Sequence, residues 1–202
     1  MTGEMTRSRY RWFIIFLLFA ITAINYIDRS AIAYAIPAMQ RELGLSPADI
    51  GIILGAFGIG YAITTLIGGF AVDRHGARLV LTVAVILWSL SIGATALASG
   101  FIVLCASRVL LGVSEGPNFP ALTGAVSHWL SPHERATALG IMDFGFAIAG
   151  FRAPAITGWV LDRRGSFVDG FLLMTALALS SVLVVLLFHH PDRDREDTAL
   201  KA

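Results

Sequence analysis

The sequence is poor in charge, in lysine and in cysteine. Only 14% of its 202 residues are charged, whereas 56% are hydrophobic. A soluble globular domain carries about 25% charged residues, so this composition excludes that class. One cysteine, Cys105, supplies neither a disulfide framework nor the spacing of a metal site. Because it lies inside an apolar run, we interpret it as a small core residue.

Catalytic and nucleic-acid-binding motifs are also missing. The sequence has no Gly-rich phosphate loop after a strand and no plausible nucleophile–base set. It has no basic patch interleaved with aromatic residues, the pattern that indicates nucleic acid. We therefore expect a protein that is not an enzyme, needs no cofactor or metal, and does not bind nucleic acid.

Long apolar runs fill most of the chain instead. Each approaches or exceeds the ~18–20 residues that cross ~30 Å of hydrocarbon as a helix. We predict an all-α membrane protein with six transmembrane helices, at residues 12–34, 50–72, 79–97, 101–126, 136–161 and 171–188. The whole bundle occupies residues 12–190, between an N-terminal segment (1–11) and a charged tail (191–202).

The distribution of basic residues predicts the orientation. With the N-terminus inside, nine Lys and Arg residues fall in cytoplasmic stretches and three on the opposite side. The positive-inside rule then places both termini in the cytoplasm, in a multi-pass protein of the inner (plasma) membrane. The first run follows three arginines as a secretory signal does, but Asn25, Asp28 and Arg29 interrupt it. We interpret it as an uncleaved first span.

Two motif pairs indicate an internal repeat. Leu45-Ser46-Pro47 precedes the second run and Leu130-Ser131-Pro132 the fifth, each with a serine N-cap followed by proline and an acidic residue. The pattern Gly-x-x-x-Asp-Arg-x-Gly closes both runs, from Gly69 and from Gly158. The offsets are 85 and 89 residues. Because each copy has three spans, an odd number, the second copy enters the membrane from the opposite face to the first. We therefore predict a 3+3 inverted repeat with a binding site where the copies meet.

Two charged pairs interrupt the apolar runs. Asp28 and Arg29 lie in the first, about 24 Å from its inner end, while Arg108 and Glu115 lie in the fourth, about 10 and 21 Å from its outer end. Seven residues return a helix to nearly the same face, and Gly112 between them leaves room on that face. A charge at such depth costs several kcal/mol, so these residues line a pathway or pair with one another.

The chemistry of these four residues fits proton-coupled anion movement. A guanidinium binds a carboxylate with two parallel hydrogen bonds, and a glutamate removed from water exchanges a proton more readily near neutral pH. Our hypothesis is that Glu115 is the principal coupling proton site and that Asp28 pairs with an arginine. The alternative is that the four charges only balance one another between packed helices. A further polar set either hydrogen-bonds substrate or joins helices: Asn25, Tyr26, Tyr61 and Asn118.

These motifs resemble a known family. Gly69, Asp73, Arg74, Gly76 and Arg78 match the signature loop between spans 2 and 3 of the major facilitator superfamily. The segments 25–29, 108–120 and 129–135 resemble the anion:cation symporters within it. The resemblance implies proton-driven transport of a small organic anion, such as a sugar acid. It also implies proton-carrying roles for Asp28 and Glu115, anion-binding or charge-balancing roles for Arg29 and Arg108, and a conformational role for the loop.

The resemblance also implies one half of the major facilitator fold. That family has twelve spans, and this chain resembles the first six. We therefore expect a second six-helix half, as a separate chain or a second copy. The alternative is a truncated, non-transporting half that acts only with a second six-helix half or as an assembly or regulatory subunit of the membrane. The fifth run departs from the family in Arg152, with Asp143 on the opposite helix face, and neither residue has an assigned role.

Overall fold

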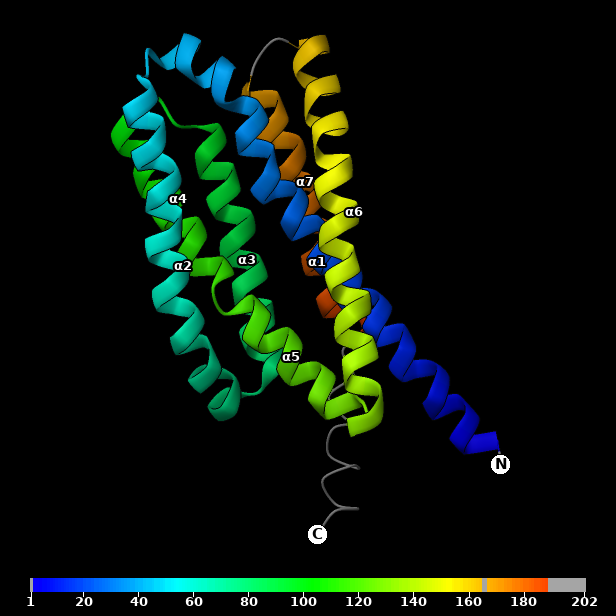
Figure 1. The fold of residues 1–202 in the computed structure, drawn as a ribbon. Helices are drawn as coiled ribbons and strands as arrows, with labels where there is room; N and C mark the ends of the chain where they lie inside the picture. Colours follow the sequence, from blue (N-terminus) through cyan, green and yellow to red (C-terminus); the bar gives the residue numbers. More distant parts are fainter. Residues whose placement is uncertain (1, 165–166, 189–202) are drawn as a thin grey trace.

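The computed structural model describes residues 2–164 and 167–188, which are almost entirely helical (Figure 1). The predicted tail at 191–202 lies outside the described residues. The described chain forms seven helices: α1 (Thr2–Leu43), α2 (Pro47–His75), α3 (Ala77–Ala96), α4 (Phe101–Glu115), α5 (Asn118–Trp129), α6 (Pro132–Arg164) and α7 (Phe167–Phe188). The all-α prediction is therefore confirmed for this part of the chain.

The fourth apolar run is not one helix. A turn at Gly116 and Pro117 divides it into α4 and α5, so six predicted runs correspond to seven helices. Proline has no backbone N–H, so Pro117 cannot continue the hydrogen-bond pattern of the helix, although Gly116 before it keeps helical dihedral angles (φ −53°, ψ −44°). The Gly116 N–H still donates to the Gly112 carbonyl and closes α4, and the chain then leaves in a new direction as α5 (Figure 1).

The cap predicted for α2 is present in full. The backbone N–H of Asp49 donates to Ser46 Oγ at 3.2 Å, and the backbone N–H of Ser46 donates to Asp49 Oδ2 at 2.9 Å. Pro47 occupies the start of the helix, where its missing N–H has no cost. Gly76, with φ of 81°, ends α2 in a conformation that other residues rarely adopt.

The start of α6 uses the second serine differently. Ser131 Oγ donates to Glu134 Oε2 at 2.6 Å, while the Glu134 N–H donates to the Ser131 carbonyl. The Glu134 carboxylate also forms an ion pair with Arg11 of α1, with N–O distances of 2.9 Å to both carboxylate oxygens. The Ser131 hydroxyl first, and the Arg11 charge after it, hold the pKa of Glu134 below its ordinary value. This pair joins the beginning of α1 to the α5–α6 turn.

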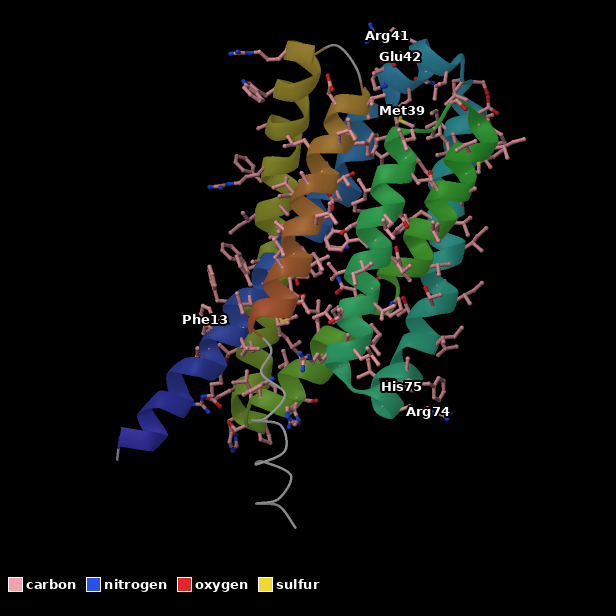
Figure 2. All side chains as sticks on the ribbon, turned by 180° about the vertical axis from the view of Figure 1, so that it is seen from behind. Phe13, Met39, Arg41, Glu42, Arg74 and His75 are labelled. Atoms are coloured by element: carbon pink, nitrogen blue, oxygen red, sulfur yellow. The ribbon has the colours of Figure 1, made fainter. Side chains whose placement is uncertain are left out.

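The helices pack in three main pairs. α2 lies mostly against α4, α1 against α6 and α3 against α7. Apolar side chains fill the space between them, among them Ile15, Met39, Trp88 and Leu104. Charged residues concentrate at the two ends of the bundle, with Arg41 and Glu42 at one and Arg74 and His75 at the other (Figure 2).

The outer surface between these ends is apolar. Ile59, Leu66 and Phe70 of α2 are all exposed, and so are Phe144 and Phe151 of α6. By length and composition, three helical segments of the described chain can cross a membrane: Arg11–Ser30, Pro47–His75 and Ala77–Ala96. An apolar surface of this extent belongs in contact with lipid or another protein, not with water.

Candidate functional site

α1 and α4 bring the four charged residues together in the interior. Asp28, Arg108 and Glu115 are each 3% exposed or less. Arg29 is different, because a third of its side chain remains accessible while the Glu115 side chain is fully covered. Arg29 is therefore the part of this charged group that a solute can reach.

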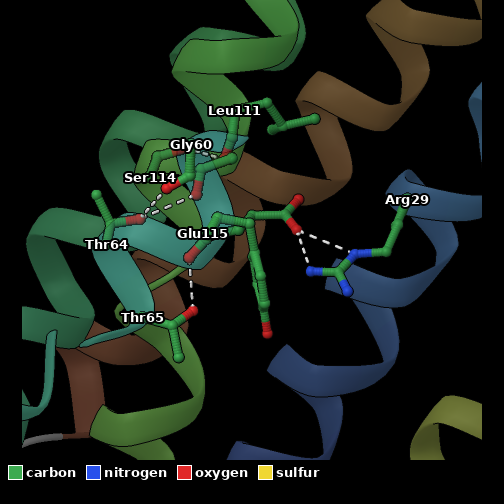
Figure 3. A network of polar contacts seen from close by, with 9 residues as sticks. Arg29, Gly60, Thr64, Thr65, Leu111, Ser114 and Glu115 are labelled. Carbon is green, nitrogen blue, oxygen red and sulfur yellow. Dashed lines mark hydrogen bonds and ion pairs between the residues drawn. The ribbon is translucent and has the colours of Figure 1, made fainter. Parts of the chain in front are cut away.

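Arg29 and Glu115 form the central ion pair (Figure 3). Glu115 Oε2 accepts hydrogen bonds from Arg29 Nη2 at 2.8 Å and from Nε at 3.3 Å. Both donors use the same carboxylate oxygen, and Oε1 has no hydrogen-bond partner among the described residues. Asn25 lies beside this carboxylate. The pair thus holds two charges in the interior while leaving one carboxylate oxygen unused.

Two aromatic rings of α2 hold the Arg29 guanidinium in place. Its central carbon lies 4.8 Å from the Phe57 ring centre and 4.7 Å from that of Tyr61. The two rings also stack on each other at 5.5 Å. A cation over an aromatic face gains roughly 0.5–2 kcal/mol, more where water is excluded. α2 therefore fixes the orientation of an arginine that belongs to α1.

Arg108 is held on the other side by α3. Its Nη2 donates to Thr95 Oγ1 at 2.9 Å, and Thr95 Oγ1 in turn donates to Ser107 Oγ at 3.2 Å. The guanidinium lies 5.6 Å from the ring centre of Phe171 of α7. Its Nε has no hydrogen-bond partner among the described residues. Arg108 thus remains a buried cation facing the carboxylates.

Asp28 makes no ion pair within the described chain. Of the two arginines in the charged group, Arg29 forms an ion pair, and its partner is Glu115. Adjacent residues point about 100° apart on a helix, so Asp28 turns into the bundle and not toward its neighbour. There it experiences the charges of Glu115 and Arg108 without a hydrogen bond to either. The described residues therefore include no arginine paired with Asp28, and Arg108 acts on it only through its charge.

Gly112 leaves room on its helix face, as its position between Arg108 and Glu115 had led us to expect. The α2 backbone fills that space. A Cβ at Gly112 would overlap the Phe57 carbonyl oxygen and lie 2.8 Å from the Tyr61 nitrogen. Thr64 Oγ1 donates to the Gly112 carbonyl at 3.3 Å across the same contact. The glycine permits the backbone approach that brings the aromatic rings of α2 to Arg29.

The other polar residues expected at the site divide into two groups. Tyr61 and Asn25 lie at the ion pair, as described above. Tyr26 turns toward α6, where its ring packs 5.1 Å from that of Phe146. Asn118 is buried at the start of α5, and its Oδ1 has no hydrogen-bond partner among the described residues.

The expected conformational motif lies away from the charged group, at the α2–α3 turn. Asp73 and Arg74 are exposed there, and Arg78 is half-buried. Arg78 and Trp129 line an apolar pocket between α1, α3, α5 and α7. On α6, Asp143 and Arg152 are both exposed.

Three residues that support the charged group were not predicted from the sequence: Phe57, Thr95 and Phe171. They resemble ordinary apolar or helical residues. Only their neighbours in space distinguish them.

Comparison with known proteins identifies the family. The model of the Major Facilitator Superfamily matches residues 18–202. The chain belongs to this superfamily of transporters; it is a multi-pass membrane protein and not an enzyme. Among solved structures, a bacterial homolog to the human lysosomal transporter Spinster, inward-facing and unoccupied, superposes with a TM-score of 0.82 at 22% identity. That match covers 90% of this chain and 43% of the other.

Two similar curated proteins are named for sugar acids. A hexuronate transporter of Bacillus subtilis (strain 168) is 42% identical over 170 residues, which are 84% of this chain and 40% of that protein. A galacturonate transporter of Dickeya chrysanthemi is 32% identical over 186 residues, 92% of this chain and 54% of that protein. The chain thus spans about half, or less, of the length of these relatives.

Proposed function

We propose that the protein forms the proton-binding and anion-binding half of a secondary transporter for small organic anions of the sugar-acid or carboxylate type. The observation that carries this proposal is the Arg29–Glu115 ion pair, in which the cation is accessible and the anion is covered. The hexuronate and galacturonate transporters related to this chain support the substrate class.

The geometry supports a proposed coupling mechanism. A substrate carboxylate that reaches Arg29 competes with Glu115 for the same guanidinium donors. Once Glu115 loses this partner, it is a buried carboxylate next to Asp28, and such a group is stable only when it takes up a proton. Anion binding and proton binding then favour each other, which is the requirement for symport. Arg108 balances the charge that remains.

The packing supports a 3+3 inverted repeat. A two-fold operation that exchanges the first copy with the second turns α1 into α4 and α5, α2 into α6, and α3 into α7. Under this operation the α2–α4 contact becomes the α6–α1 contact, and the α3–α7 contact maps onto itself. These three are the main helix pairs of the bundle. The charged group lies between α1 and α4, the first helices of the two copies, as expected for a site between repeats.

A second six-helix bundle, from a separate chain or a second copy, completes the proposed transporter. It would cover the accessible side of Arg29 and enclose the substrate. The proposed location is the inner membrane with both termini in the cytoplasm, in accord with the basic residues Arg74 and Arg78 at one end of the bundle. The remaining candidate is a half that assembles with or regulates a partner and moves no solute itself.

Uptake of radiolabelled galacturonate into membrane vesicles tests the function. Vesicles contain the chain alone or together with a second six-helix bundle. We expect uptake that rises as the external pH falls, and we expect Glu115→Gln to abolish this pH dependence. Glu42→Gln is the matched control, because Glu42 is exposed at the end of α1.

Full pH dependence in Glu115→Gln would contradict the role of Glu115. Uptake by the chain alone, with no cross-link between copies, would contradict the need for a second bundle. No uptake in either vesicle would favour the assembly or regulatory role.

A further inference from the structure

An apolar pocket lies beside the turn between α2 and α3, at one end of the bundle, and four helices form its wall: α1, α3, α5 and α7. α1 contributes Ile14, Leu17, Leu18 and Ile21, whose spacing places them on one face of the helix. Because a helix rises by about 1.5 Å per residue, this wall extends about 10 Å along α1. The pocket and its open mouth together hold about 460 Å³ of empty space, a volume typical of small-molecule sites.

Arg78 is the one charged residue in the lining of this pocket, and it is half-buried. The ion pairs of the described chain join Arg11 to Glu134 and Arg29 to Glu115, so Arg78 has no acidic partner there. An arginine can lie along an apolar surface and extend its charge to water without any ligand. Here, however, an open apolar space adjoins the cation. This combination suits an anion that carries a long apolar part.

The position of the pocket corresponds to the boundary between lipid headgroups and hydrocarbon. Trp129 lines the pocket at the last residue of α5, and tryptophan concentrates at that boundary in membrane proteins. Arg74 and His75 lie at the same end of the bundle (Figure 2). The outer surface between the two ends is apolar, with Leu66 and Phe70 of α2 exposed on it. A headgroup at Arg78 would therefore place its hydrocarbon at the depth of the pocket.

We propose that this pocket binds one acyl chain of an anionic phospholipid and that Arg78 holds the phosphate of its headgroup. A guanidinium binds phosphate oxygens with two parallel hydrogen bonds. A zwitterionic headgroup carries a cation of its own that repels Arg78, so the anionic lipid binds more tightly. Binding of this kind requires only that the chain lie in a bilayer, and it is independent of the proposed transport function.

Quenching of Trp129 fluorescence by brominated lipids tests this proposal. The purified full chain is placed in phosphatidylcholine bilayers with an equal small fraction of brominated phosphatidylglycerol or brominated phosphatidylcholine. Bromine quenches a tryptophan that it contacts, and the difference from Trp129→Phe isolates the Trp129 signal. We expect stronger quenching by the anionic lipid. In Arg78→Gln the fraction of this lipid at half-maximal quenching should rise about fivefold, because an arginine near anionic headgroups contributes about that factor.

Three variants separate the site from other effects. Arg74→Gln removes an exposed charge that does not line the pocket, and the preference for the anionic lipid should remain. Arg78→Lys keeps the charge and should retain most of the preference, which distinguishes loss of the cation from misfolding. Ala125→Leu narrows the pocket without a change of charge and should weaken quenching by the anionic lipid.

Four results would overturn the proposal. Equal quenching by the two lipids would exclude recognition of an anionic headgroup, and an unchanged preference in Arg78→Gln would exclude Arg78. Equal losses in Arg78→Gln and Arg74→Gln would indicate attraction to the whole charged end of the bundle. Complete loss of the preference when soluble glycerol phosphate is added would assign Arg78 to a free anion.

Discussion

Replacing Gly112 with alanine should separate α2 from α4 at the ion pair. The added Cβ would overlap the Phe57 carbonyl oxygen and lie 2.8 Å from the Tyr61 nitrogen and 3.1 Å from the Phe57 carbonyl carbon. Ordinary contacts of a Cβ are 3.4–4 Å. All three obstacles are backbone atoms, which no side-chain rotation can remove. The helices must therefore move apart by on the order of 1 Å to restore ordinary contact distances.

The magnitude follows from two opposing effects. Overpacking of a close contact costs about 1–3 kcal/mol. Replacing a helical glycine by alanine returns about 0.5–1 kcal/mol, because alanine loses less backbone freedom on folding. Since the obstacle is rigid, we expect a net loss of about 1–2 kcal/mol. The same movement carries Glu115 away from Phe57 and Tyr61, which orient Arg29, so the ion pair should loosen as well.

Unfolding of the purified protein in detergent, followed by circular dichroism, measures this loss. The matched control is Gly55→Ala, also a helical glycine, because a Cβ at Gly55 meets nothing within 4 Å. This control should be neutral or slightly stabilising, by up to about 1 kcal/mol. If Gly112→Ala were as stable as Gly55→Ala, the backbone contact between α2 and α4 would not be as close as described, and the reasoning would fail.

Three further predictions concern caps and buried polar contacts. Ser46→Ala should destabilise the protein by about 1 kcal/mol in the same unfolding assay, because it removes the N-cap of α2. The contacts of Glu134 with the Ser131 hydroxyl and then with Arg11 should stabilise the fold above the ordinary pKa of a glutamate and lose this effect as pH falls through the lower folded pKa. Glu134→Gln should therefore flatten the acid limb of a stability–pH curve. Thr95→Val should cost about 1–3 kcal/mol, because it leaves the buried Arg108 guanidinium without its hydrogen-bond acceptor.

Matched variants control these measurements. Glu42→Gln removes an exposed carboxylate at the end of α1 and should keep the acid limb. Thr123→Val alters a threonine whose hydroxyl donates only to carbonyls of its own segment, and it should change stability by less than about 0.5 kcal/mol. Equal effects of Thr95→Val and Thr123→Val would contradict the contact to Arg108. An unchanged acid limb in Glu134→Gln would contradict the contacts of Glu134 with Ser131 and Arg11.

Local features of this protein were predictable from the sequence, because they depend on residues close together in the chain. Long apolar stretches form helices that satisfy their own backbone hydrogen bonds, so the all-α class follows from composition and run length. The cap at Ser46 was predictable because it involves only the next three residues. The charged pairs Asp28–Arg29 and Arg108–Glu115 could likewise be found within the first and fourth apolar runs from the sequence.

Tertiary structure alone decided how those charges are used. Arg29 pairs with Glu115 and not with the carboxylate beside it, because successive side chains on a helix diverge and α4 meets only one of them. The sequence indicated room at Gly112 but not what fills it, and only the packing shows that the α2 backbone does. The sequence shows which charged residues lie within apolar helices, and the packing of the helices decides which of these residues contact one another.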